Sequence, residues 1–357
     1  MKKALSILLC LALVIPVFGC SSPSTPSAAT PAAVAEPAAT EAAQPSATEA
    51  PAPQEGIKWR FVSAFTKSAA EHTGFWLFFD RVNHELDGRL NIEYLGSTEI
   101  VAYFDQFEQL GKGTFEIGHL PVNMAENLLP VTDALYLTEY TPMEMRENGT
   151  YEYMIKKYAD AMNLQFLGLT GGENYAYTLY TNFEVNSLDD FKGKTIRTAP
   201  VFVPFVEAMG AGAVAIGAGE VYTALERGVV DGFGWSTIGA VDYAWYEVTK
   251  YRIAPSFYPC NVGIYVNKDA YDALPDDLKA EVNRIAAEVE AETYSMMGDM
   301  VQKEFAELES KGMKTITLTG DLEQQWLNTA REAGWKNLEK LDPQGCAEVR
   351  PLVTKGN

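Results

Sequence analysis

Residues 194–233 read KTIRTAPVFVPFVEAMGAGAVAIGAGEVYTALERGVVDGF. Strand-like segments at 194–198, 214–216 and 229–233 alternate in it with helix-like segments at 201–209 and 220–227. Gly210 and Gly228 follow the two helical segments, where a helix commonly ends on glycine. Strands that alternate with helices are typical of βαβ units in a mainly parallel sheet. The segment therefore predicts an α/β fold.

The same alternation extends on both sides of this segment. Further strands are expected at 58–64, 89–95, 116–120, 164–170, 175–181 and 261–266, and helices at 73–86 and 100–110. Residues 275–311 form one helical pattern of about ten turns. A helix of that length normally spans more than one packing unit. We therefore predict a two-lobed fold, like that of periplasmic binding proteins, in which two α/β domains share a central cleft and a domain-spanning helix. Lobe I comprises 56–176 plus 261–300, and lobe II comprises 177–260 plus 301–350.

The N-terminal region predicts export. Residues 1–19 have the basic start and apolar run of a signal peptide, and Val17-Phe18-Gly19-Cys20 resembles a bacterial lipobox. Cys20 would then carry lipid. Residues 20–55 are mostly Ala, Pro, Ser, Thr, Glu and Gln, and we interpret them as a flexible tether. The expected location is extracytoplasmic, in the periplasm or on the outer face of the cell membrane, with a lipid anchor.

Composition narrows the function. The chain has 357 residues and a formal net charge of −20, which argues against nucleic-acid binding, because that needs a basic face. The histidines and cysteines show no metal-ligand spacing, so no metal site and no cofactor is predicted, although the abundant acids leave a cation with oxygen ligands open. Cys260 and Cys346 could form a disulfide or remain free thiols.

Two catalytic or nucleotide-binding patterns are considered and set aside. The glycines from Gly210 to Gly219 follow a helix, whereas a dinucleotide fingerprint follows a strand. Residues 234–239 are one residue too long for a Gly-x-Ser-x-Gly nucleophile elbow. His72 and His84 are expected on the surface. His119 ends a strand and is either a structural histidine or a residue of the cleft.

Arg197 is the strongest candidate for a ligand-binding residue. It lies at the carboxyl end of its predicted strand, where open α/β sheets bind ligands. Its guanidinium is a two-pronged donor suited to a carboxylate. The alternative is a structural salt bridge to Glu220 or Asp231, and the residues alone do not separate the two.

Aromatic side chains form a second group of candidates at the ends of strands and helices in lobe II. They are Tyr175, Tyr177, Tyr180, Tyr222, Phe233 and Trp235. Most are compatible with a core position, and Tyr180 and Tyr222 are expected there. Trp235 is expected in a loop after a strand, and with Tyr177 and Phe233 it is predicted to bind ligand.

Three segments resemble the solute-binding proteins of tripartite ATP-independent periplasmic (TRAP) transporters. They are SLDDFKGKTIR at 187–197, EVYTALERGVVDG at 220–232 and YDALP at 271–275, and the resemblance extends over about 58–342. It implies two α/β domains that close on an organic acid and deliver it to a small and a large membrane subunit, driven by an ion gradient. The carboxylate-binding arginine of the family corresponds to Arg197.

Two positions depart from the dicarboxylate and sialic-acid receptors of this family. Thr178 stands where those proteins carry a second arginine, and Trp235 stands where they carry an asparagine. A tryptophan there is similar to the branch that binds monocarboxylates and keto acids. That branch also uses a residue near 171–174, so Glu173 and Asn174 become candidates.

The predicted function is a receptor without enzymatic activity, for a monocarboxylate or keto acid. The alternatives are a membrane-tethered hydrolase, which needs two positioned carboxylates, and the receptor of an ATP-driven transporter. A neighbouring gene pair for a small and a large membrane protein would separate these classes. The sequence does not decide the ligand, the coupling ion, the oligomeric state or which membrane carries the anchor.

Overall fold

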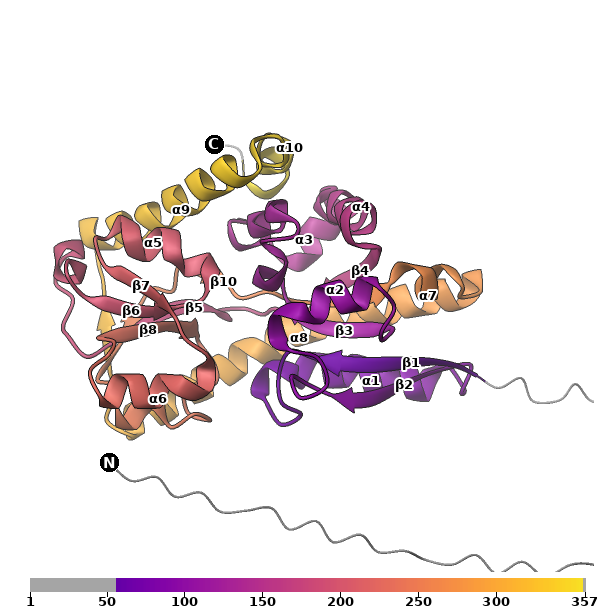
Figure 1. Ribbon diagram of the computed structural model, residues 1–357, viewed down its shortest axis with the longest axis horizontal. Helices are drawn as coiled ribbons and strands as arrows, with labels where there is room; N and C mark the ends of the chain where they lie inside the picture. Colours follow the sequence, from indigo (N-terminus) through magenta and orange to yellow (C-terminus); the bar gives the residue numbers. More distant parts are fainter. Residues whose placement is uncertain (1–55, 356–357) are drawn as a thin grey trace, which may run out of the picture. The chain divides into compact units, whose positions relative to one another are not determined.

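Two β-sheets organise residues 56–355, the part of the chain that the computed structural model describes (Figure 1). The first has the order β2-β1-β3-β11-β4, with β1 Ile57–Ser63, β2 Leu90–Gly96, β3 Ile117–Pro121, β4 Leu164–Leu169 and β11 Val262–Asn267. The second has the order β12-β9-β5-β8-β6-β7, and β10 pairs with β5 beside this path. Its strands are β5 Ala176–Thr181, β6 Thr195–Thr198, β7 Gly212–Ala215, β8 Gly232–Ser236, β9 Tyr251–Ala254, β10 Tyr258–Pro259 and β12 Lys314–Thr317.

Helices cover both sheets, which confirms the predicted α/β class. They are α1 Thr73–Glu85, α2 Gln106–Gly111, α3 Pro142–Glu147, α4 Thr150–Met162, α5 Val203–Ala208, α6 Ala218–Glu226, α7 Lys268–Asp272, α8 Asp276–Ser310, α9 Asp321–Leu341 and α10 Pro343–Val353. Short 3-10 helices include η1 Ala70–His72, η2 Tyr103–Asp105 and η4 Pro130–Tyr136. The predicted signal peptide (1–19), Cys20 and the tether (20–55) lie outside the described residues.

The sheets are mixed, not mainly parallel as the βαβ pattern predicted. Strand β11 runs antiparallel to both β3 and β4, and β5 runs antiparallel to both β8 and β9. Both strands follow a segment that crosses from one sheet to the other. A strand that enters from the other sheet needs no crossover helix, so it can pair antiparallel with its neighbours.

The chain passes between the sheets three times. The first passage joins β4 to β5, the second joins β10 to β11, and the third is the helix α8 (Figure 1). The 35 residues of α8 confirm the predicted long helix, which contacts α1 and β4 on one side of the molecule and β12 on the other. The lobe bounds remain a prediction, and α10, assigned in part to lobe II, contacts α4 and η4 beside the first sheet.

A buried ion pair joins α8 to the first sheet. Glu290 is 1% exposed and accepts hydrogen bonds from Arg146, from the Tyr151 hydroxyl and from the Leu169 backbone N–H. Three donors on three elements therefore satisfy one buried carboxylate, which fixes the register of α8 against β4 and α4.

Two smaller findings concern the cysteines and the membrane. Cys260 and Cys346 are buried free thiols, which decides the alternative that the sequence left open. Within residues 56–355, none of the helices is both long enough and apolar enough to cross a bilayer.

Candidate functional site

Arg197 and Trp235 lie on one face of the second sheet. Strands β6 and β8 are parallel, and Arg197 is in register with Phe233. Because side chains alternate along a strand, Trp235 shares the face of Phe233 and so that of Arg197. The predicted loop position of Trp235 is wrong, since β8 spans Gly232–Ser236 and not 229–233. Val229, expected to begin the strand, is instead exposed after α6.

The Arg197 side chain is buried without a carboxylate partner. It is 6% exposed, and it donates from Nε to the carbonyl oxygen of Ile216 (2.8 Å) and from Nη1 to that of Gly234 (3.1 Å). Neither alternative acid pairs with it, and Asp231 instead accepts a hydrogen bond from the Thr195 backbone N–H (2.8 Å). Within residues 56–355, Nη2 makes no hydrogen bond, so part of the donor fork remains available.

Burial dominates the electrostatics of this guanidinium. Desolvation lowers the pKa of Arg197 to about 10, and the phenols of Tyr103, from η2, and Tyr243, from the loop after β8, act in the opposite direction. A buried cation surrounded by neutral groups is stabilised when an anion binds to it.

Aromatic rings surround the same position. The Arg197 guanidinium lies 5.2 Å from the ring centroid of Trp235. Trp235 makes edge contacts with Trp245 and Tyr243, whose rings are stacked 4.6 Å apart. Phe233 is fully buried and stacks on Tyr180 at 4.7 Å, as part of the core between β5, β8 and α6.

The remaining three candidates are Tyr177, Glu173 and Asn174. Tyr177 is buried and makes an edge contact with Phe202 (4.7 Å). Glu173 donates its backbone N–H to the Tyr294 carbonyl oxygen of α8 (2.9 Å), and Asn174 lines a cavity of about 340 Å³. Within residues 56–355, no hydrogen bond, ion pair or cation–π contact joins any of the three to Arg197.

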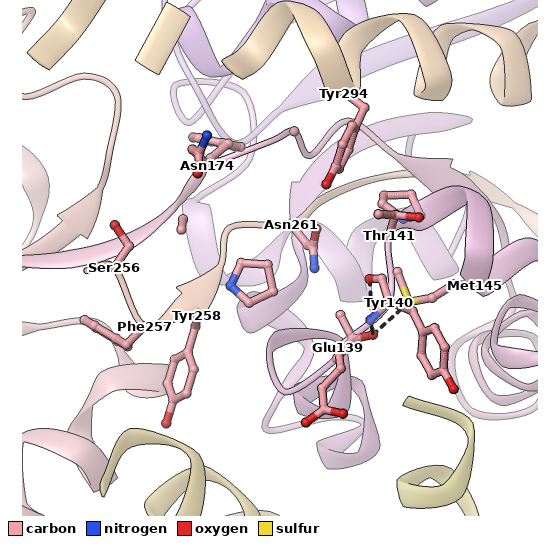
Figure 2. A pocket seen from close by; sticks show the side chains of 16 residues that line it. Glu139, Tyr140, Thr141, Met145, Asn174, Ser256, Phe257, Tyr258, Asn261 and Tyr294 are labelled. Carbon is pink, nitrogen blue, oxygen red and sulfur yellow. Dashed lines mark hydrogen bonds between the residues drawn. The ribbon is translucent and has the colours of Figure 1, made fainter. Parts of the chain in front are cut away.

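The cavity beside Asn174 lies where the chain crosses between the sheets. In the view of Figure 2, Asn174 and Ser256 lie on one side of it and Thr141 and Tyr294 on the other. These residues come from the segment before β5, the segment before β10, the N-terminus of α3 and α8. The cavity therefore adjoins the first two interlobe passages.

Glu71 is a residue that the sequence did not single out. It lies in η1 and is 4% exposed. Burial raises its pKa to about 7; its own backbone N–H acts against this, and the charges of Asp242 and Glu304 add to it. No local pattern predicts this burial, because the charges that act on Glu71 come from Asp242 and Glu304, more than 150 positions further along the chain.

Two of the three histidines, His72 and His119, form a closed network. His72 was expected on the surface but is fully buried, because it contacts Ser63 at the end of β1 and His119 on β3. The ring nitrogens Nδ1 of His72 and His119 are 3.1 Å apart, and His119 Nε2 lies 2.7 Å from Thr170 Oγ1. Burial lowers the pKa of His72 to about 4 and that of His119 well below its usual value. Both are neutral at pH 7, which favours the structural interpretation of His119.

Ser236 donates its hydroxyl to the Ile238 carbonyl oxygen (2.6 Å) and has no histidine partner among the described residues. Within residues 56–355, no three histidine, cysteine or acidic side chains gather in a geometry that could hold a metal ion.

Comparison with known families supplies a match over most of the chain. Residues 61–340 match the model of the bacterial extracellular solute-binding protein family 7, DctP. A monocarboxylate 2-oxoacid-binding periplasmic protein of Nostoc sp. is 22% identical over 236 residues, or 62% of this chain and 63% of that protein, so the match covers slightly less than two thirds of this relative. An ectoine/5-hydroxyectoine-binding periplasmic protein of Ruegeria pomeroyi is 24% identical over 307 residues, or 82% of this chain and 89% of that protein.

The fold has solved counterparts. A TRAP periplasmic solute-binding protein from Desulfovibrio salexigens, solved with bound orotic acid, superposes with a TM-score of 0.73 at 17% sequence identity. The superposition covers 83% of this chain and 97% of that one, so the two folds agree over nearly the whole counterpart.

Proposed function

The chain belongs to family 7 of the bacterial extracellular solute-binding proteins, and from this we propose that it is the receptor of a TRAP transporter for a small organic monocarboxylate. It binds the acid outside the cytoplasm, closes on it and delivers it to a small and a large membrane subunit. It performs no chemistry on the ligand.

One observation carries the proposal: Arg197 is a buried guanidinium with no anion beside it. Buried charges in native proteins are usually paired with an opposite charge, and an unpaired one needs a reason. A ligand carboxylate accepting from the free part of the fork provides one. The position at the end of β6 agrees with ligand binding at the carboxyl ends of strands.

Arg252 provides a useful contrast within the same sheet. It is also buried, at 7% exposure, but its guanidinium carbon lies 3.5 Å from the ring centroid of Phe305, and Nη2 donates to Thr315 Oγ1 (2.9 Å). The charge of Glu309 acts on it as well. An acid therefore acts on Arg252, whereas the charges that act on Arg197 include none from an acid.

The acids near the site support a monocarboxylate over a dicarboxylate. The site contains three acids that act on one another electrostatically: Glu71, Asp242 and Glu304. The charges of Glu71 and Arg197 both act on the pKa of Tyr243. A second carboxylate on the ligand would meet this negative group without a second arginine to bind it, and like charges in a buried site are costly.

Membrane attachment is a separate part of the proposal. We propose that Cys20 carries lipid and that residues 20–55 act as a tether. Cys20→Ala should then release the protein from membranes. A variant that stays membrane-bound after a carbonate wash would show that another segment holds it.

Calorimetric titration tests the proposed ligand class. We expect monocarboxylates to bind more tightly than matched dicarboxylates such as succinate, and the best ligand to reduce the radius of gyration in solution scattering. Closure would bend the passages near Ala176 and Cys260. Tighter binding of succinate, or an unchanged scattering profile at saturation, would contradict the proposal.

A further inference from the structure

Three polar groups near the second sheet make no side-chain hydrogen bond among residues 56–355. Nη2 of Arg197 has no hydrogen bond, and Nε1 of Trp235 is buried without an acceptor. The Glu71 carboxylate is also buried, and the only hydrogen bond that acts on its pKa comes from its own backbone N–H. These groups supply two donors and one acceptor.

Glu71 and Trp235 approach each other across one glycine. A methyl group added at Gly239 would lie 3.0 Å from Glu71 Oε1 and 3.2 Å from Trp235 Nε1. Gly239 has a φ of +101°, which side-chain-bearing residues rarely adopt. The glycine thus allows a carboxylate from η1 and an indole from β8 to border the same space.

The two opposite charges both border the indole of Trp235 but are not paired. No ion pair joins Arg197 to Glu71, although the phenol of Tyr103 is within electrostatic range of both, and so is that of Tyr243. Burial raises the pKa of each phenol, the negative charge of Glu71 adds to this, and the positive charge of Arg197 opposes it. A positive and a negative group are therefore held apart within one buried region.

We propose that the ligand is zwitterionic, with a carboxylate bound by Arg197 and a cationic nitrogen bound by Glu71, which makes Glu71 a specificity-determining residue. The inference rests on the proposed function, because it takes Arg197 as the carboxylate anchor. An α-amino acid and a cyclic amidinium carboxylate both have this chemistry, whereas a simple 2-oxo acid has only the anionic end.

The surroundings of Glu71 favour a cation. Asp242 lies in the loop after β8 and Glu304 lies on α8, and both add negative charge at Glu71. Trp235 borders Glu71 across Gly239, Tyr243 contacts Trp235, and aromatic rings attract cations in desolvated sites. A ligand ammonium or amidinium would offset this negative charge, whereas a carbonyl oxygen would not.

The experiment compares matched ligands and matched variants. Wild-type protein, Glu71→Gln and Arg197→Ala are titrated with L-amino acids, with the 2-oxo acids that carry the same side chains, and with ectoine. Glu93→Gln, which removes an exposed acid on β2, is the control. Circular dichroism confirms that each variant is folded, and Glu71→Gln preserves the shape of the side chain.

We expect wild-type protein to prefer a zwitterion over its 2-oxo counterpart. Glu71→Gln should weaken zwitterion binding by at least about tenfold and leave 2-oxo acid binding unchanged or stronger, because only the zwitterion loses a charge partner. Glu93→Gln should behave as wild type. A wild-type preference for the 2-oxo acid in every pair, or an equal effect of Glu71→Gln on both classes, would overturn the inference.

The two proposals fail in different ways. If Arg197→Ala binds both classes as tightly as wild type, the carboxylate anchor of the proposed function is wrong. If Arg197→Ala loses both classes while Glu71→Gln does not discriminate between them, the anchor stands and only the zwitterion assignment is wrong.

Discussion

The guanidinium of Arg197 lies over the indole of Trp235, with 5.2 Å between Cζ and the ring centroid. The two residues come from adjacent strands, β6 and β8, and share one face of the sheet. Nε and Nη1 already donate to backbone carbonyl oxygens, and the cation–π contact adds a third restraint on the guanidinium. This contact therefore orients the donor fork.

Trp235→Ala should weaken ligand binding by about two- to thirtyfold, since a cation–π contact contributes about 0.5–2 kcal/mol. Trp235→Phe should lose less affinity, because phenylalanine retains an aromatic ring. Ligand should also shift the tryptophan emission of wild-type protein and not that of Trp235→Phe. An undiminished shift in Trp235→Phe would mean that another tryptophan reports binding.

Gly239→Ala should reduce binding strongly, because its methyl group would meet both Glu71 and Trp235. Gly312→Ala is the matched control, since Gly312 has a φ of +97° but open space around the position of a Cβ. Both variants should lose about 1–3 kcal/mol of unfolding free energy through backbone strain. Only Gly239→Ala should lose affinity, and equal affinity losses in the two variants would contradict this account.

Zwitterion binding should depend on pH through Glu71. Burial raises the pKa of Glu71 to about 7, so a proton must leave before the carboxylate can pair with a cation. Affinity should therefore fall by up to roughly tenfold per pH unit below 7 and level off above it. Asp242 and Glu304 face Glu71, as do the phenols of Tyr103 and Tyr243.

Titration at pH 5.5, 6.5 and 7.5 checks this dependence. Glu71→Gln should have a much flatter profile, whereas Glu304→Gln should keep the slope, although Glu304 also has a pKa raised by burial to about 7. If the slope disappears in Glu304→Gln but persists in Glu71→Gln, the titrating residue is Glu304 and the assignment to Glu71 is wrong.

Glu290→Ala should cost about 3–5 kcal/mol of unfolding free energy, because it leaves Arg146, the Tyr151 hydroxyl and the Leu169 N–H without their shared acceptor. Asp160→Ala removes one partner of an exposed pair with Lys156 and should change stability little. Urea denaturation measures both. Equal small losses would show that the buried carboxylate contributes no more than a surface one.

The α/β class and the long helix were predictable because both depend on local periodicity. The direction of β5 and β11 was not, since it follows from where the chain crosses between sheets. The strand that carries Trp235 was misplaced by three residues, because Val229 and Val230 look like strand residues but end the turn after α6.

The position of Arg197 at a strand end was predictable, because it also depends on a local pattern; its role in binding stays a prediction. The burial of Glu71 and His72 was not predictable, because it depends on tertiary contacts: Asp242 and Glu304 act on Glu71, and His119 contacts His72. Phe233 has the residue type of a ligand-binding aromatic, but the structure buries it fully against Tyr180. Residue type alone does not separate the two cases.

Calorimetric titration of Arg197→Ala and Arg197→Lys, with Arg252→Ala as the buried-arginine control, tests the central claim most directly. Leaving a ligand carboxylate unpaired costs about 3–5 kcal/mol, so Arg197→Ala should weaken binding by about two to three and a half orders of magnitude. Arg197→Lys should weaken binding nearly as much, because an ammonium cannot form two parallel hydrogen bonds. Arg252→Ala should keep its affinity. A folded Arg197→Ala protein with less than tenfold weaker binding would contradict the account, because the carboxylate would then be held elsewhere.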